Sequence, residues 1–198
     1  MKISAKLLLT FASLALVAAP CSSSAANNQE ASVGGLVFMP QAPLFGTGEG
    51  GVASYRYWFS PDWAATAVLG ATHVGVKHAG ASGSFDLFPI GADLTYNVID
   101  LAPFRLNANL GLRYEFVQSK ASILNIADKE VDMSLDDVVL GQIGLDADCA
   151  IAKHWAIFAA LSYQQDFNKN KLQTPDGTLR ETEDLSGFNI TLGLRANF

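Results

Sequence analysis

The sequence predicts an all-β chain that crosses a membrane as a closed, antiparallel, up-and-down barrel of eight strands. Segments of strand length alternate apolar and polar residues, which gives each strand one apolar and one polar face. The charged residues of these segments share the polar phase, so the opposite face suits lipid better than water. After the first 26 residues no apolar run reaches the about 18 to 20 residues of a spanning helix. A chain without such a helix can cross a membrane as a closed barrel, because its strands form hydrogen bonds with one another's backbone groups.

The amino end has the pattern of a secretory signal peptide. Lys2 and Lys6 provide a charged start, an apolar run follows over 7–19, and Ser24-Ala25-Ala26 provides a small-x-small cleavage site. We expect cleavage after Ala26, with Ala25 as second choice. The sequence therefore predicts a signal peptide over 1–26 and one barrel domain over 27–198.

Two cysteines and an acidic balance limit the alternatives. Cys21 follows an apolar run as in a lipoprotein, but Pro20 stands where a lipobox has a small residue. Cys149 is then the only cysteine of the mature chain, so no internal disulfide is expected. The formal net charge is -6, and loss of Lys2 and Lys6 lowers it by two, to -8. Such a chain is unsuited to nucleic acid, whose phosphates are bound by Lys and Arg.

Eight segments have the length of a tilted spanning strand, about 9 to 11 residues or more. The fifth is the clearest, with Leu106, Leu110 and Leu112 in one phase and Arg105 and Arg113 in the other. The first and third are rich in Gly and Ala and leave their register open. The predicted strands are 31–40, 50–59, 63–76, 86–98, 104–118, 137–151, 155–167 and 185–198.

The connections between these strands alternate in length. Tight turns are predicted at 60–62, 99–103 and 152–154, and longer polar loops at 41–49, 77–85, 119–136 and 168–184. Outer-membrane barrels have short turns in the periplasm and long loops outside the cell. The pattern therefore predicts that both ends of the chain lie in the periplasm.

Aromatic residues mark the expected membrane boundary. The chain ends on Phe198, and Trp63 and Trp155 follow two of the short turns in similar apolar-turn-Trp-Ala units. Aromatic rings favour the level at which lipid meets water. We therefore expect Trp63, Trp155 and Phe198 to lie at the periplasmic interface.

The last strand, the alternating connections and the hairpin from Tyr55-Arg56-Tyr57-Trp58-Phe59 to Trp63 together resemble the OmpA-like and OmpX-like eight-stranded β-barrels of the Gram-negative outer membrane. The resemblance covers nearly all of the mature chain without a long family-specific motif. It implies a monomer in the outer membrane, in contact with its lipids and lipopolysaccharide. It also implies that the barrel-assembly machinery reads the terminal aromatic residue. No cofactor is implied.

A soluble eight-stranded barrel, such as a lipocalin, is the structural alternative. That class places its charges outside and its apolar residues inside. Here the charged strand residues share the phase of Asn, Thr and Gly, and the other phase is almost free of charge, which favours the membrane barrel. The charges assigned to the lumen are Arg56, Asp93, Arg105, Arg113, Glu115, Asp146, Asp148 and Arg195.

These four Arg and four carboxylates predict a network of ion pairs, because unpaired buried charges are costly. We expect Arg105, Arg113 and Arg195 to pair with Glu115, Asp146 or Asp148. An eight-stranded barrel holds side chains rather than an open channel. The network is therefore interpreted as a polar core, and a gated path for ions or protons is the alternative.

Catalysis and metal binding are not predicted. A serine nucleophile needs a histidine within reach, yet none of His73, His78 and His154 stands two residues from a serine on a lipid-facing strand, the deacylase-like arrangement. The histidines and Cys149 lack ligand spacing, and the acidic residues near 128–137 lack the spacing of a calcium loop.

The sequence thus favours a structural or surface-interaction role, with a plugged lumen and ligand contacts in the loops 119–136 and 168–184. Loops on a rigid scaffold are where binding residues usually lie. A narrow pore for ions or small solutes is the second hypothesis, and an outer-membrane lipid hydrolase the third.

Overall fold

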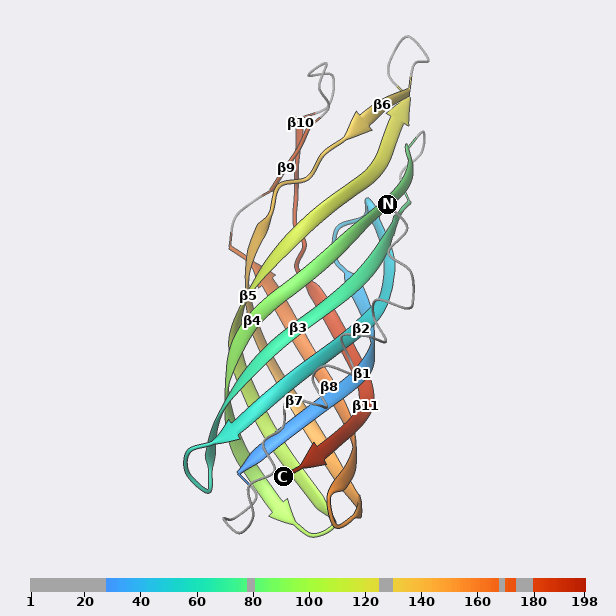
Figure 1. Ribbon diagram of the computed structural model, residues 1–198. Coiled ribbons are helices and arrows are strands. Elements are labelled where there is room, and N and C mark those ends of the chain that lie inside the picture. Colours follow the sequence, from blue (N-terminus) through green and yellow to red (C-terminus); the bar gives the residue numbers. More distant parts are fainter. Residues whose placement is uncertain (1–27, 78–80, 125–129, 168–169, 174–179) are drawn as a thin grey trace.

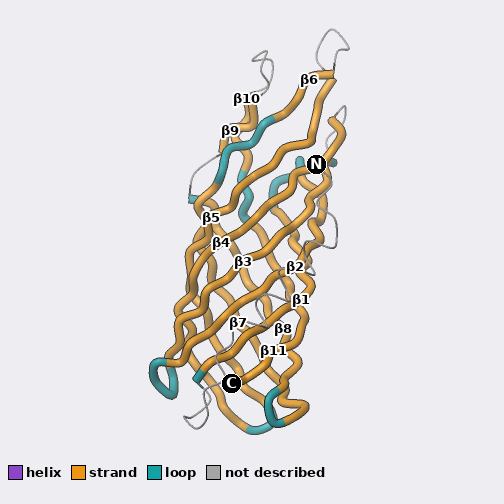
Figure 2. The backbone as a smooth tube through the Cα atoms, viewed as in Figure 1, coloured by secondary structure: helices purple, strands orange, loops and turns teal. Residues whose placement is uncertain are grey.

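The computed structural model describes residues 28–77, 81–124, 130–167, 170–173 and 180–198. The predicted leader over 1–26 lies outside these residues. No helix long and apolar enough to cross a membrane occurs in the described part of the chain, which Figure 2 shows to consist of strands joined by loops and turns.

Eight long strands form one closed antiparallel barrel, as predicted (Figure 1). Each strand pairs with its neighbour in the chain, the last strand pairs with the first, and the fourth pairs with the fifth to complete the ring. The strands are β1 (Gln29–Pro40), β2 (Phe45–Trp58), β3 (Trp63–Val76), β4 (Ala81–Leu101), β5 (Phe104–Leu124), β7 (Val138–Ala152), β8 (Trp155–Asp166) and β11 (Gly187–Asn197).

Tight turns join the strands at one end of the barrel. β4 ends at Leu101 and β5 begins at Phe104, and the turns from β2 to β3 and from β7 to β8 are similarly short. The start of β1 and the end of β11 meet at this same end, where Glu30 lies opposite Asn197. The three predicted tight turns therefore lie at one end of the barrel. The predicted alternation in length is only partly present, because the connection from β1 to β2, 41–44, is no longer than that from β2 to β3, 59–62.

At the other end the strands continue further than the sequence pattern indicated. β4 begins at Ala81, inside the predicted loop 77–85, and β5 runs to Leu124, inside the predicted loop 119–136. The short β6 (Glu130–Met133) pairs with this extension of β5, and β9 (Asn170–Gln173) pairs with β10 (Arg180–Glu183) within the predicted loop 168–184. β2 likewise begins at Phe45, inside the predicted loop 41–49. Parts of all four predicted loops are thus strands, and those of β4, β5, β6, β9 and β10 project beyond the barrel rim (Figure 1).

The sequence pattern ends early because the apolar residues move from the outer face of the strand to its inner face. β5 shows this clearly. In its first part Leu110 and Leu112 point outward, with 63% and 59% of their surface exposed, and Arg113 points into the lumen. Near its end Lys120 is exposed and Ala121 is buried. The first part is therefore built to face lipid outside, whereas the last part is built to face water outside, like a soluble barrel.

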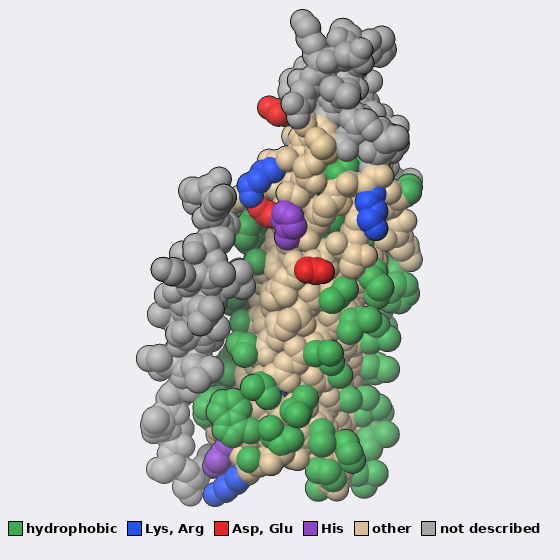
Figure 3. Space-filling view, turned by 90° about the vertical axis from the view of Figure 1, so that its right-hand side faces the viewer, with side chains coloured by type: hydrophobic (Ala, Val, Ile, Leu, Met, Phe, Trp, Pro, Cys, Tyr) green, Lys and Arg blue, Asp and Glu red, His purple; other side chains and the backbone are tan. Residues whose placement is uncertain are grey.

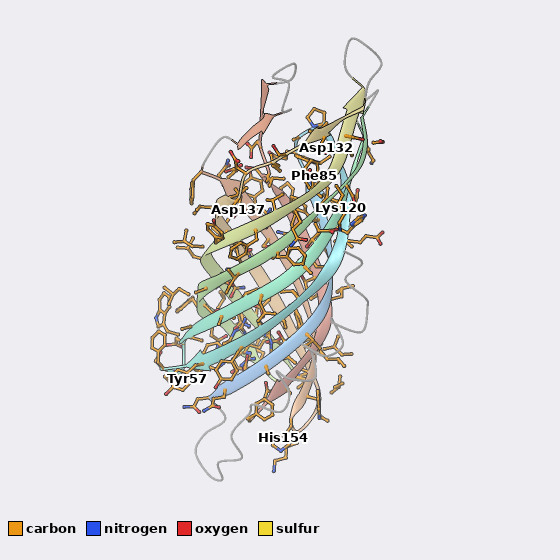
Figure 4. All side chains as sticks on the ribbon, turned by 45° about the horizontal axis from the view of Figure 1, so that its top comes forward. Tyr57, Phe85, Lys120, Asp132, Asp137 and His154 are labelled. Carbon is orange, nitrogen blue, oxygen red and sulfur yellow. The ribbon has the colours of Figure 1, made fainter. Side chains whose placement is uncertain are left out.

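The surface of the barrel follows the same division. Figure 3 shows apolar side chains over the lower part of the wall, with charged side chains and a histidine above them. In Figure 4, where the top is turned forward, Lys120, Asp132 and Asp137 lie at the projecting end, and Tyr57 and His154 at the short-turn end. The apolar belt identifies a membrane-spanning barrel whose strands continue beyond the membrane on one side.

Candidate functional site in the barrel lumen

All eight charges assigned to the lumen from the sequence point inward. Each lies in the inward phase of its strand, and the strands come from all parts of the chain. Arg56 lies in β2, Asp93 in β4, Arg105, Arg113 and Glu115 in β5, Asp146 and Asp148 in β7, and Arg195 in β11.

The centre of the network is Arg195 between two aspartates. Its Nη1 lies 2.8 Å from Asp146 Oδ1 and 2.5 Å from Asp148 Oδ1. Arg56 Nη2 donates to the other oxygen of Asp146 at 3.0 Å. Asn109 also donates to that oxygen, at 2.8 Å. Each carboxylate therefore has several charged or polar donors, which offsets the cost of burying it.

Glu30 belongs to the same network, although the sequence analysis did not include it. Its Oε1 accepts from Arg105 Nη2 at 2.5 Å, and its Oε2 lies 3.4 Å from Arg56 Nη1. The first strand was predicted to begin at Ala31, too late to include this residue. The signal was present, because Glu30, Ser32 and Gly34 continue one phase of the alternation.

Aromatic rings support two sides of this ion-pair layer. The guanidinium groups of Arg56 and Arg105 lie 5.6 Å and 5.1 Å from the ring of Trp58, and that of Arg195 lies 4.8 Å from Phe158. These distances are in the range of cation–π contacts. We call the set Glu30, Arg56, Arg105, Asp146, Asp148 and Arg195 the ion-pair layer.

A second pair lies further from the short turns, and it differs from the expected pairing. Arg113 Nη1 and Nη2 donate to the two oxygens of Asp93 at 2.6 Å and 2.7 Å. Glu115 was expected to pair with an arginine. Among the described residues no cation lies within 4.0 Å of its carboxylate, and its Oε2 is buried without a hydrogen-bond partner.

Apolar side chains fill the lumen at the projecting end. Phe38, Phe85, Leu87 and Leu140 are at most 1% exposed, and the rings of Phe45 and Phe85 meet edge to face at 5.5 Å. Figure 4 shows Phe85 among the side chains at this end. We call this cluster the apolar plug; its buried members are Phe38, Ala42, Leu44, Phe45, Val74, Phe85, Leu87, Ala121, Leu135, Val138, Leu140 and Leu185.

A cavity of about 110 Å³ lies in the lumen and touches both layers. Arg56, Asp146 and Arg195 of the ion-pair layer contribute to its wall, as do Phe38 and Leu87 of the apolar plug. Hydroxyl and amide side chains line much of the rest, including Thr72, Gln142, Ser162, Gln164 and Thr191. We call this space the lumen chamber.

The wall beside the chamber has an interruption between β3 and β4. The two strands are paired from Trp63 to Leu69 and again from Thr72, in one unbroken register, but the two positions between them are unpaired. Pro89 lies opposite this gap and has no N–H to donate. Both Gly70 and Pro89 also line the lumen chamber.

The predicted interface aromatics lie together at the short-turn end. Trp63 and Trp155 are 40% and 42% exposed, and the ring of Trp63 contacts that of Tyr96 at 4.8 Å. Phe198 donates its backbone N–H to the carbonyl oxygen of Gln29 at 2.9 Å, which joins the chain end to the first strand. Its own ring is exposed.

A polar row crosses the outer wall above the apolar belt. His73 Nδ1 lies 2.7 Å from Asp86 Oδ1, and Lys120 Nζ contacts the other oxygen of Asp86. Within the described residues no group of three or more potential metal ligands comes together. Cys149 is a free thiol, half buried in the wall.

No family model matches the sequence, and no curated protein matches it. Solved structures with the same architecture do match the fold of this chain. OprG of Pseudomonas aeruginosa is 15% identical with a TM-score of 0.65, covering 86% of this chain and 95% of OprG. A major outer-membrane protein of Thermus thermophilus is 14% identical with a TM-score of 0.55, covering 86% and 99%. Ail, the attachment invasion locus protein of Yersinia pestis, is 16% identical with a TM-score of 0.52, covering 86% and 97%.

These likenesses establish the fold. The strand number, the antiparallel closure and the apolar belt agree with what the OmpA-like and OmpX-like resemblance implied. The chain therefore has the eight-stranded β-barrel fold of proteins that lie in the bacterial outer membrane.

Proposed function

We propose that this protein is an outer-membrane scaffold with a closed lumen, whose projecting strands and loops contact a ligand or a surface outside the cell. One observation carries the proposal: the ion-pair layer and the apolar plug fill the lumen at two successive levels. A solute on an axial path would have to break buried ion pairs and then open a packed apolar cluster. Both steps are costly.

The projecting end supports the second part of the proposal. β4 and β5 extend beyond the belt, and β6 and the β9–β10 pair add to them. A strand extension of this kind presents loops away from the membrane surface. Ail was crystallised with the heparin analogue sucrose octasulfate. The net charge of -6 makes a polyanion of that class a poor ligand for this chain.

Planar-bilayer recording tests the closed lumen. The refolded wild-type barrel is expected to give no steady unitary conductance in symmetrical KCl. A variant with Arg56→Ala and Arg195→Ala removes part of the ion-pair layer and tests whether the apolar plug alone closes the lumen. It is also expected to give no steady unitary conductance. Steady unitary conductance in the wild-type barrel would contradict the proposal.

Adhesion of intact cells tests the surface role. Cells that display the wild-type barrel are compared with cells in which residues 170–183 are replaced by a Gly-Ser linker of equal length. The comparison measures settling of the cells and attachment to polystyrene. The variant is expected to lose most of the attachment, whereas replacing Ser60 and Asp62 at the opposite end by Gly leaves it unchanged. Equal attachment of all three strains would count against the role.

A second function, exchange of small apolar solutes through the wall, is favoured by the unpaired positions opposite Pro89. The gap adjoins the lumen chamber, so a solute could pass sideways into the membrane without crossing the ion-pair layer. A disulfide between Ala71→Cys and Phe88→Cys, in a Cys149→Ala background, would close this route. Uptake of a small alkane into liposomes should then fall on oxidation and recover on reduction; uptake that ignores the redox state would exclude the route.

A further inference from the structure

Among the described charges that are buried in the lumen, all but one take part in an ion pair. In the ion-pair layer Arg56, Arg105 and Arg195 match Glu30, Asp146 and Asp148 one for one. Arg113 and Asp93 match each other. Glu115 is the inward carboxylate of β5 that is left without a cation among the described residues.

Glu115 is also buried, so solvent hardly screens its charge. It is 4% exposed, and its strand neighbours are Pro89 of β4 and Val138 of β7, the latter a member of the apolar plug. Its Oε2 has no hydrogen-bond partner among the described residues. Burying an ionised carboxylate without a cation in contact is costly, and a bound positive charge would offset that cost.

The lumen chamber provides the space for that counter-charge. Glu115 is part of its wall, together with the hydroxyl or amide oxygens of Thr72, Gln142 and Ser162. A volume of about 110 Å³ exceeds what a single water molecule needs. Arg56, Arg113 and Arg195 also line the chamber, but each of them is paired with Asp146 or Asp93. The wall therefore offers one carboxylate that is outside these ion pairs, neutral oxygen ligands and room for water molecules.

We propose that the lumen chamber binds one partly hydrated monovalent inorganic cation, with Glu115 as its charged ligand. Hard cations prefer oxygen ligands, and divalent ions usually take more than one carboxylate. One unmatched carboxylate balances a single positive charge. The neutral oxygens of the chamber hold the remaining water of the ion.

Thermal unfolding of the refolded barrel in NaCl and in N-methyl-D-glucamine chloride, at equal ionic strength and pH, tests the proposal. The bulky organic cation controls for screening. The midpoint of the wild-type barrel is expected to be higher in NaCl, because a ligand that binds the folded state stabilises it. Glu115→Gln should lose this difference. Glu49→Gln, which removes an exposed outer-wall carboxylate, should keep it.

Carbon-13 NMR of the Glu115 carboxyl group gives a second, independent measurement. The resonance is expected to move on titration with Na⁺ at pH 7.5 and to show an ionised carboxylate throughout. A resonance that shows a protonated carboxyl and ignores Na⁺ would overturn the proposal, since a proton would then be the counter-charge. Equal NaCl effects on the wild-type and Glu115→Gln barrels would overturn it as well.

Discussion

At the scale of single residues, the lumen is held by charges whose partners are closely matched. Arg195 contacts both Asp146 and Asp148, and its side chain is only 4% exposed. Removing one member of such a buried set leaves the opposite charges without a partner. The cost is then larger than for any ion pair on the surface.

Arg195→Gln should therefore lower the free energy of unfolding by about 3 to 5 kcal/mol. Lys153→Gln, in the exposed turn between β7 and β8, is the matched control and should change it by about 0.5 kcal/mol or less. Urea unfolding in lipid vesicles measures both. Equal midpoints would mean that the ion-pair layer does not stabilise the barrel.

Gly111 is required by the ion pair beside it. A Cβ atom at this position would lie 1.8 Å from Asp93 Oδ1 and 2.6 Å from the carbonyl oxygen of Ala92. Gly111→Ala should displace Asp93 from Arg113 and lower the free energy of unfolding by about 1 to 3 kcal/mol. At Gly35 a Cβ meets no atom within 4 Å. Gly35→Ala should thus be neutral or slightly stabilising, and a loss equal to that of Gly111→Ala would refute the steric account.

At the scale of elements, the long strands that reach the apolar plug, from β1 to β5 and β7, have two parts with opposite burial patterns. The part in the membrane turns its apolar side chains to lipid, and the projecting part turns them inward to form the apolar plug. In the projecting part the hydrophobic effect acts as it does in a soluble protein. The plug therefore stabilises the ends of β4, β5 and β7 above the membrane.

Phe85→Ala should lower the free energy of unfolding by about 3 to 5 kcal/mol, because it opens a cavity in the apolar plug. Phe104→Ala removes the same side chain from an exposed position, 61% accessible, and should cost much less. Amide exchange of β4 and β5 should rise at their projecting ends in the Phe85 variant alone. Similar exchange in the two variants would show that the plug does not hold these ends together.

At the scale of the whole molecule, the depth of the barrel in the membrane follows from its apolar belt and aromatic residues. Trp63 and Trp155 lie on the outer wall near the short turns, and Trp58 lies inside, over Arg56 and Arg105. The three tryptophans of the chain are therefore fluorescent probes of both faces of the barrel wall, two on the outer face and one on the inner face. Phe198 lies at the same end of the barrel, where its backbone N–H donates to Gln29.

Single-tryptophan variants in vesicles containing brominated lipid test this placement. Quenching of Trp63 and Trp155 fluorescence should be strong with bromine near the head groups and weaker with bromine deep in the acyl chains. Trp58 should be quenched little by either lipid, because the barrel wall separates it from lipid. Strong quenching of Trp58 would reverse the assignment of inside and outside.

The sequence by itself determined the barrel and its inner face. Alternation with a period of two is a local property, so it can be read along one strand, and the inward phase of Arg56, Asp93 and Glu115 follows from it directly. The strand starts were less certain, which is why Glu30 was missed. The projecting strands were missed because their polar outer residues resemble those of loops.

Only the tertiary structure decided which charges pair and where the apolar plug lies. Arg113 binds Asp93 on the neighbouring strand rather than Glu115 on its own, because partners depend on the register between strands and not on distance along the chain. The plug likewise draws on residues from Phe38 to Leu185. Register and closure are properties of all strands together, so the pattern of a single strand does not contain them.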